Sequence, residues 1–473
     1  MRSLKFFFFL KKSLLFPLII LFFSLLIHFS WLSYPQEVVF DEVHFGKFAS
    51  AYFTGKYFFD IHPPLGKLII AGGSYLGGYH NYLSIHPPFE FKDIGEKFSD
   101  LPFLGFRFFP ALAGALLPLT IYWLVRLLGA STKTALIASF FILSETTFLT
   151  QSRFILLDSF LLLFGFLGLC FFLSARKKNY PLLLTFLAGL FLGASFSVKW
   201  TGLSFLGLAG IFLFIDWLET NEKFFFSFFS KKFSPLATFK EESFFKKLFS
   251  FLKPLIIILT TALAVYLFAF AVHFNLLSLP GDGDAFMEEN FRQHQIGFWE
   301  KFLQLNQKIN FYNSNLKGTH PDASHFWQWP ILKKPIHYWN DGEARIIFFG
   351  NPILWLGGFL AIILFIIFWK KIPLSSKNKF FLLVGFWSNF LPFLSVTRAL
   401  FLYHYLSALT FSLIMWAIVF DKLICFKNRW GKIFQLSFFG LVLVGFCLFS
   451  FLAYGLKPLG DWHQKILDMI LYY

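Results

Sequence analysis

The sequence has little charge for its length. Only 14% of its 473 residues are Asp, Glu, Lys or Arg, against about 25% in an ordinary soluble domain. Hydrophobic residues make up 57% of the chain, and its mean hydropathy is +0.63. This composition argues against a soluble globular protein, because too few polar side chains remain to cover a water-exposed surface.

Cysteine is equally scarce. The three cysteines, Cys170, Cys425 and Cys447, lie in or beside apolar segments. They form no CxxC pair and have no metal-ligand spacing to histidine. The sequence therefore predicts neither a disulfide framework nor a zinc site.

Long apolar runs are abundant. A membrane-spanning helix needs about 20 mostly apolar residues, and the runs predict an all-α integral membrane protein with about 11 transmembrane helices. The first run is too long for a signal peptide and is followed by no A-x-A cleavage site, so we interpret it as an uncleaved helix. The runs cover residues 13–33, 104–125, 134–150, 155–175, 180–196, 201–217, 255–275, 346–369, 380–394, 399–420 and 433–455.

The basic residues indicate an orientation for these spans. With the N-terminus in the cytoplasm and the C-terminus outside, the inside segments hold 24 of the 42 lysines and arginines within 81 residues. This bias follows the positive-inside rule. It also accounts for the formal net charge of +16 without nucleic acid as a partner. The inside segments are residues 1–12, 126–133, 176–178, 218–253, 370–379 and 421–432.

Two long segments fall on the outside, residues 34–103 and 276–345, where binding and catalytic residues are typically found. The expected organisation is an N-terminal transmembrane module (1–275), the second outer loop (276–345) and a C-terminal four-helix region (346–473). The inside loop 218–253 alternates Phe with Lys and Glu, which predicts an amphipathic segment on the inner leaflet. Gly281-Asp282-Gly283-Asp284 lacks the spaced ligands of a calcium loop and is interpreted as a turn.

Directly after the first span come Asp41-Glu42-Val43-His44-Phe45-Gly46-Lys47 and then Asp60-Ile61-His62-Pro63-Pro64-Leu65-Gly66-Lys67. Adjacent carboxylates near a membrane face can take a proton from a hydroxyl or hold a cation. Taken alone, they are better explained by an ordinary solvated acidic pair.

The wider pattern resembles the protein O-mannosyltransferase family. Its motifs occur in family order from about residue 37 to about residue 410, and the similarity covers most of the chain. Besides the first outer loop, the matching segments are Arg107 to Gly114, Gln151 to Ser159, Ser197 to Gly202, Trp327 to Pro330, Gly350 to Pro352 and Arg398 to Leu406.

The resemblance implies a GT-C type glycosyltransferase that moves mannose from a polyprenyl phosphate to a Ser or Thr hydroxyl, with inversion at the anomeric carbon. Eukaryotic members insert a β-trefoil (MIR) domain in the second long loop, whereas only about 70 residues fill this interval here. The chain therefore resembles a bacterial or archaeal member.

The resemblance also implies roles for particular residues in one outward-facing, basic-lined pocket. Asp41 is the expected base, and Glu42 would orient it or interact with the acceptor. The cations expected to bind the donor phosphate are Arg107, Arg153, Lys199, Arg398 and His404, and the supporting residues are His62, Lys67, Asp158 and Tyr403.

Several of these residues have a structural alternative. Arg107 could extend to the membrane interface, and Arg153 with Asp158 could form a structural pair. His404 and Tyr403 could belong to an aromatic interface belt. His62 and Lys67 could belong to a rigid turn that leads into an interfacial helix from Leu65 to Leu76.

Other functions remain open from the sequence. The same carboxylates and cations would serve a transferase of another polyprenyl-linked sugar to a protein or a lipid. A transporter or flippase would instead place charges near the middle of the membrane and repeat its halves. The expected partners are a polyprenyl-phosphate-mannose donor, exported Ser/Thr-containing proteins and membrane lipid. The expected location is the plasma membrane, with the site on its extracytoplasmic face. The sequence indicates no cofactor with certainty, and it leaves a divalent metal and the oligomeric state open.

Overall fold

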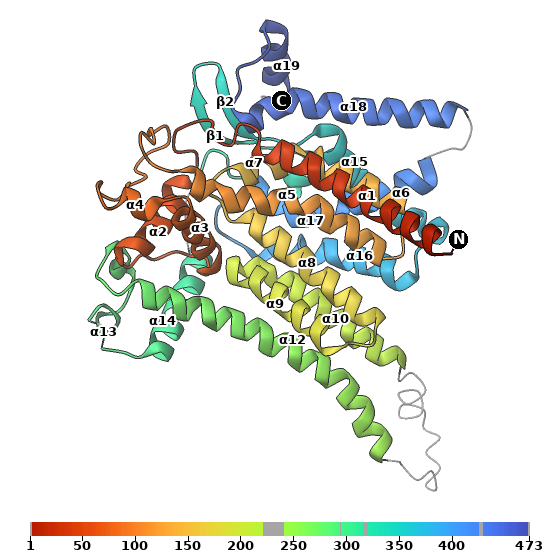
Figure 1. Cartoon of the computed structure of the whole chain (residues 1–473), viewed down its shortest axis with the longest axis horizontal. Coiled ribbons are helices and arrows are strands. Elements are labelled where there is room, and N and C mark those ends of the chain that lie inside the picture. Colours follow the sequence, from red (N-terminus) through yellow and green to blue (C-terminus); the bar gives the residue numbers. More distant parts are fainter. Residues whose placement is uncertain (1, 221–240, 294, 316–319, 425–428, 472–473) are drawn as a thin grey trace.

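The computed structural model describes residues 2–220, 241–293, 295–315, 320–424 and 429–471. Helices dominate this part of the chain, and long apolar helices form a bundle (Figure 1). The long helices are α1 (Arg2–Phe29), α5 (Leu104–Leu127), α6 (Thr132–Leu143), α8 (Asp158–Lys177), α9 (Leu182–Val198), α10 (Leu203–Thr220), α12 (Glu241–Leu276), α15 (Pro352–Ile367), α16 (Ser376–Ser388), α17 (Leu406–Val419) and α18 (Arg429–Tyr454).

Six segments in the described residues are long and apolar enough to cross a membrane. They correspond to α5, α8, α10, α12, α17 and α18, and shorter apolar helices include α1, α6, α9 and α15. The multi-spanning helical architecture is therefore confirmed, whereas the count of 11 spans and their orientation stay predictions.

The most buried spans lie at the centre of the bundle. About 89% of the apolar window in the α17 segment and 78% of that in α8 is buried inside the protein, against 33% for α12 and α18. Figure 1 shows α17 in the middle of the bundle, with α12 and α18 at its two sides. The central helices thus pack against protein, and the outer ones present wide apolar faces to lipid.

Close helix packing supports one side of the bundle. α9 and α12 approach at Gly189 and Gly193, where a Cβ atom on Gly193 would lie 2.5 Å from the Cα atom of Ala262. Small residues four apart let two membrane helices come together in this way.

Both long outer segments fold at the same end of the bundle, opposite the start of α1 (Figure 1). The first contains α2 (Glu42–Thr54), α3 (Leu65–Leu76) and α4 (Tyr79–Tyr82). The helix predicted from Leu65 to Leu76 is confirmed as α3. It begins directly after Pro63-Pro64, because proline is tolerated where a helix has no partner for its first N–H groups.

The second outer segment contains α13 (Glu289–Arg292), α14 (Phe298–Asn315) and an antiparallel hairpin of β1 (Ile336–Asp341) and β2 (Ala344–Phe348). The all-α prediction missed this hairpin. The apolar residues of β2 adjoin those of α15, and the two were predicted as one span from 346 to 369. Asn351 separates them, because its side chain accepts a hydrogen bond from the N–H of Ile353 and begins α15.

Backbone hydrogen bonds join the two outer segments. The N–H of Tyr57 donates to the carbonyl of Leu279 (2.9 Å), and the N–H of Leu279 donates to the carbonyl of Gly55 (2.8 Å). The N–H of Phe40 donates to the carbonyl of Tyr338 (3.1 Å). Segments far apart in the sequence therefore form one cap over the bundle.

Some expectations concern other parts of the chain. Asp282–Phe286 forms a short 3-10 helix, in keeping with the turn predicted at Gly281–Asp284. Residues 241–253 of the predicted amphipathic loop begin α12, whereas residues 221–240 lie outside the described residues. Cys170 and Cys447 are free thiols, and Cys425 lies outside the described residues.

Candidate active site

A cavity of about 590 Å³ lies where the outer cap meets the central helices. Its walls come from the ends of α8, α9, α10 and α14, from the α16–α17 connection and from the loop before α3. Six of the predicted site residues line it: His62, Asp158, Lys199, Arg398, Tyr403 and His404.

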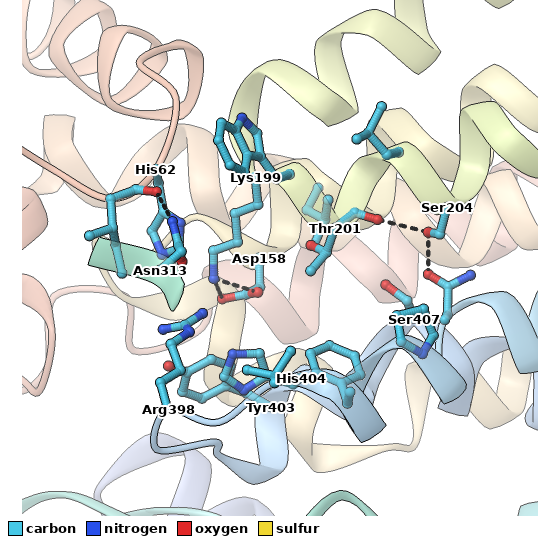
Figure 2. A pocket seen from close by; sticks show the side chains of 18 of the residues that line it. His62, Asp158, Lys199, Thr201, Ser204, Asn313, Arg398, Tyr403, His404 and Ser407 are labelled. Atoms are coloured by element: carbon cyan, nitrogen blue, oxygen red, sulfur yellow. Dashed lines mark hydrogen bonds and ion pairs between the residues drawn. The ribbon is translucent and has the colours of Figure 1, made fainter. Parts of the chain in front are cut away.

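Lys199 and Asp158 form an ion pair on the cavity wall (Figure 2). The Lys199 ammonium lies 2.8 Å from both carboxylate oxygens of Asp158. Asp158 is the first residue of α8 and Lys199 follows the last residue of α9. A carboxylate at a helix N-terminus and a cation at a helix C-terminus are both favoured by the helix dipole. The Lys199 ammonium also lies 5.2 Å from the centre of the Tyr403 ring.

Arg398 is the second cation on the cavity wall. Figure 2 shows its guanidinium pointing toward the Lys199–Asp158 pair. In the described part of the chain, no carboxylate forms an ion pair with Arg398, although the charge of Asp60 acts on it. Burial lowers its pKa, but an arginine remains charged at any physiological pH. Its charge is therefore available to an anionic ligand.

Neutral polar groups complete this part of the cavity. The Nδ1 atom of His404 contacts the backbone of Phe401, and its ring stacks on Tyr403 with 4.5 Å between centres. Burial lowers the pKa of His62 well below its usual value, and the charges of Lys199, Lys67 and Arg398 lower it further. His62 is thus a neutral hydrogen-bonding group at neutral pH.

Asp41 lies beside the cavity and is not one of the residues that line it. It occupies the N-cap position of α2, and its side chain makes no capping hydrogen bond. Burial raises the pKa of Asp41 to about 6. The charges of His44 and Lys199 act against this rise, and those of Asp158 and Asp60 add to it. This carboxylate is therefore ionised at neutral pH and still basic enough to take a proton.

A chain of contacts connects the segment of Asp41 to the cavity. The ring of Phe40 stacks on Tyr338 with 3.9 Å between centres. The Tyr338 hydroxyl donates to the Gln151 side chain (2.7 Å), which in turn donates to Asp158 (2.6 Å). The position of Asp41 is thus tied to the Lys199–Asp158 pair.

Glu42 and Arg107 are fully buried and bind each other, outside the cavity. The Nε and Nη2 atoms of Arg107 donate to the two Glu42 carboxylate oxygens, each at 2.8 Å. Arg107 also donates to the carbonyls of Pro35 and Glu37, and Glu42 accepts from the N–H of Ile155 (3.0 Å). Arg107 thus does not line this cavity, and its buried contacts give no support to its extension to the interface; its role toward the donor phosphate stays a prediction.

Arg153 and Lys67 are also engaged inside the protein. Arg153 donates to the carbonyls of Ser30 and Trp31, and its guanidinium lies 4.5 Å from the centre of the Tyr454 ring. It therefore holds the end of α1 and is not the partner of Asp158. Lys67 binds the Asp60 carboxylate and donates to the carbonyl of His62 (2.7 Å), which fixes the loop that carries His62.

The cavity also contains a residue that the sequence did not indicate. Asn313 of α14 donates its amide N–H groups to the carbonyls of Ile61 and Ile309 (2.9 and 3.0 Å) and lines the cavity (Figure 2). No motif marks this asparagine, because it belongs to an amphipathic helix with several polar residues. Among the described residues, no group of three or more His, Cys, Asp or Glu side chains is arranged to hold a metal.

Comparisons with known proteins agree with this architecture. Residues 18–278 match the family described as dolichyl-phosphate-mannose-protein mannosyltransferase, and residues 298–466 match the C-terminal four-transmembrane region of protein O-mannosyltransferase. The first match covers more than half of the chain, and the protein belongs to this family. A relative in Saccharomyces cerevisiae, dolichyl-phosphate-mannose–protein mannosyltransferase 1, is 34% identical over 300 residues, which cover 60% of this chain and 32% of the relative. The chain thus matches only about a third of that relative's length.

Solved structures share the fold. The structure of the Saccharomyces cerevisiae protein O-mannosyltransferase Pmt1–Pmt2 complex bound to the sugar donor matches with a TM-score of 0.83 and 20% identity, over 97% of this chain and 92% of that one. ArnT from Cupriavidus metallidurans bound to undecaprenyl phosphate matches with a TM-score of 0.54 and 13% identity, over 96% and 78% of the two chains. The predicted GT-C type of fold is therefore confirmed.

Proposed function

We propose that this protein transfers mannose from a polyprenyl-phosphate-mannose donor to Ser or Thr hydroxyls of exported proteins, with inversion at the anomeric carbon. The observation that carries the proposal is the cavity, whose wall contains the cations Lys199 and Arg398. The charge of Lys199 also acts on the Asp41 carboxylate beside the cavity. Membership of the mannosyltransferase family supports the choice of donor and acceptor.

Arg398 and Lys199 are the proposed ligands of the donor phosphate. The bond between the anomeric carbon and the phosphate oxygen breaks during transfer, and the electron pair stays on the phosphate. A phosphate whose charge is held by arginine or lysine is a good leaving group. No carboxylate of the described residues forms an ion pair with Arg398, so it can bind the phosphate without first breaking an ion pair.

Asp41 is the proposed base. The acceptor oxygen forms its bond to the anomeric carbon while Asp41 takes the hydroxyl proton. A carboxylate with a pKa of about 6 is largely ionised at pH 7 and is a stronger base than an ordinary aspartate. Glu42 does not share this role in the proposal, because Arg107 and backbone N–H groups occupy its oxygens.

The proposed location is the plasma membrane, with the cavity on the extracytoplasmic face. The distribution of basic residues supports this orientation, since the six segments assigned to the inside are rich in Lys and Arg. Exported chains would meet the cavity on that face before they fold. Cysteines introduced between residues 276 and 345 are expected to react with an impermeant reagent from outside.

The test is mannose transfer in detergent from polyprenyl-phosphate-mannose to a Ser/Thr peptide, comparing the wild type with Asp41→Asn. Asp282→Asn is the matched control, because Asp282 lies at the same end of the molecule with 85% of its side chain exposed. We expect Asp41→Asn to lose at least a hundredfold in rate and Asp282→Asn to stay within twofold. Full activity of a folded Asp41→Asn protein would remove Asp41 as the base. Turnover only with another polyprenyl-linked sugar would reject mannose as the substrate.

A further inference from the structure

Helix α14 carries an exposed apolar ridge. Trp299, Leu303 and Phe311 are 61%, 57% and 55% exposed, and their spacing of four and eight residues places them along one ridge of the helix. Its other side is packed, with Leu305 and Ile309 buried. Large exposed apolar side chains gathered on one side of a helix mark a surface that meets something other than water.

Contacts with α12 define where this ridge lies. Phe298 packs on Phe274 and Phe302 on Phe270, with 6.1 and 5.1 Å between ring centres. One turn further along α14, Asn306 accepts a hydrogen bond from the Tyr266 hydroxyl (2.5 Å). Residue numbers rise along α14 as they fall along α12. The first half of α14 therefore contacts α12 at successive points that run back along the spanning helix from its end at Leu276.

Away from its contact with α14, α12 presents an apolar face to lipid. Its apolar segment from Leu248 to Leu276 is only 33% buried, and Phe268 is 69% exposed within it. Phe302 is level with Phe270, which lies six residues before the end of α12. At 1.5 Å per residue this is about 9 Å along the helix. An amphipathic helix at a membrane interface typically buries its apolar face by about 5–10 Å.

We propose that the Trp299–Leu303–Phe311 ridge of α14 inserts into the lipid leaflet at the cavity end of the spans. The first half of α14 packs beside residues 266–274, which belong to the membrane-spanning segment of α12, so the ridge lies at the level of lipid. The Trp200 indole donates to the Tyr266 hydroxyl (3.0 Å), which connects this level of α12 to the residue after Lys199. Asn310 and Asn313 of α14 line the cavity. Lipid contact thus sets the depth of the cavity mouth in the leaflet. The proposal concerns a membrane contact and does not depend on the transfer reaction.

The test is a depth measurement by electron paramagnetic resonance on the full chain in nanodiscs. A nitroxide is attached at Leu303→Cys, with Cys425 and Cys447 replaced by serine. Oxygen concentrates in the bilayer and a nickel chelate in water, so their relative collision rates with the label report its depth. Phe268→Cys is the lipid-exposed control. Asn340→Cys, on the exposed side of the β1–β2 hairpin, is the water-exposed control.

We expect Leu303→Cys to collide more often with oxygen than with nickel, as at Phe268→Cys, and Asn340→Cys to show the reverse. Greater nickel access at position 303 would place the ridge in water and overturn the proposal. Shielding from both reagents would mean that a protein surface covers the ridge, which also overturns it. A label at Trp299→Cys repeats the measurement one turn away if the Leu303 variant does not fold.

Discussion

The Glu42–Arg107 pair allows a test of whether Arg107 binds the donor or stabilises the folded protein. Both side chains have no solvent exposure. Arg107 donates two hydrogen bonds to Glu42 and further ones to backbone carbonyls of the segment after α1. The pair therefore joins α1, α2 and α5 directly beneath Asp41. Replacing Arg107 with alanine would leave the Glu42 carboxylate buried without a countercharge.

The magnitude follows from this burial. Breaking a buried ion pair by removing one partner costs about 3–5 kcal/mol, and the carbonyls that lose their donor add to the cost. Stabilities of folded domains are only about 5–15 kcal/mol. We therefore expect Arg107→Ala to lose about 3–5 kcal/mol in the free energy of unfolding. Combining it with Glu42→Gln should recover part of this loss, because the uncompensated charge is then gone.

The assay is equilibrium unfolding in mixed micelles, with donor dependence measured on the protein that remains folded. Arg398→Ala is the matched control, because it removes the same charge from the cavity wall without breaking an ion pair in the described residues. An Arg107→Ala protein with an unfolding free energy within about 1 kcal/mol of the wild type and a raised donor KM would refute the reasoning. That result would indicate that Arg107 binds the donor phosphate.

Three further predictions concern Asp41, the cavity and the outer cap. With a pKa of about 6, Asp41 is about 90% ionised at pH 7 and about 10% at pH 5. Since the base acts in its ionised form, kcat/KM should fall about tenfold between these pH values; a flat profile would contradict the assignment. Arg398→Ala should lower kcat/KM for the donor at least tenfold with little change in unfolding, and Arg398→Lys should restore part of it; equal effects on donor and acceptor dependence would count against phosphate binding. Gly283→Ala should destabilise the outer cap, because a Cβ there would overlap the backbone of Phe58, whereas Gly297→Ala has open space around it; equal thermal stability of the two variants would show that this packing contributes nothing.

Hydropathy was sufficient to find the long apolar helices, because lipid requires long apolar stretches whatever the packing, but it joined α6 (Thr132–Leu143) and α7 (Thr146–Arg153) into one run. The helix from Leu65 to Leu76 was also predictable, since two prolines precede it and its apolar residues continue to the end. The β1–β2 hairpin was not. The apolar residues of Ala344–Phe348 run into those of α15, and only Asn351 and the pairing with Ile336–Asp341 separate strand from helix. Strand pairing of this kind depends on tertiary contacts that a hydropathy pattern does not contain.

The candidate site could be predicted only in part, because motifs do not show how side chains are paired in the folded protein. The motifs indicated which polar residues come together at one end of the bundle, and Lys199, Arg398 and His404 do line one cavity. They could not indicate which cations face that cavity. Arg107 and Arg153 occupy equally prominent motifs, yet their guanidinium groups are used by Glu42 and by the carbonyls after α1. That distinction depends on side-chain partners brought close by the fold.

Under the proposed function, the cavity must bind the donor phosphate while the protein stays folded, and the arrangement of ion pairs is compatible with this. Burying a cation without an anionic partner costs free energy. Beneath the outer cap this cost is offset by ion pairs, which join Arg107 to Glu42 and Lys67 to Asp60. On the cavity wall, Lys199 is paired with Asp158, whereas no carboxylate of the described residues forms an ion pair with Arg398. Binding of a phosphate would supply the acceptor that Arg398 lacks. The free energy of that contact would therefore stabilise the bound phosphate, because Arg398 breaks no ion pair of the folded protein to make it.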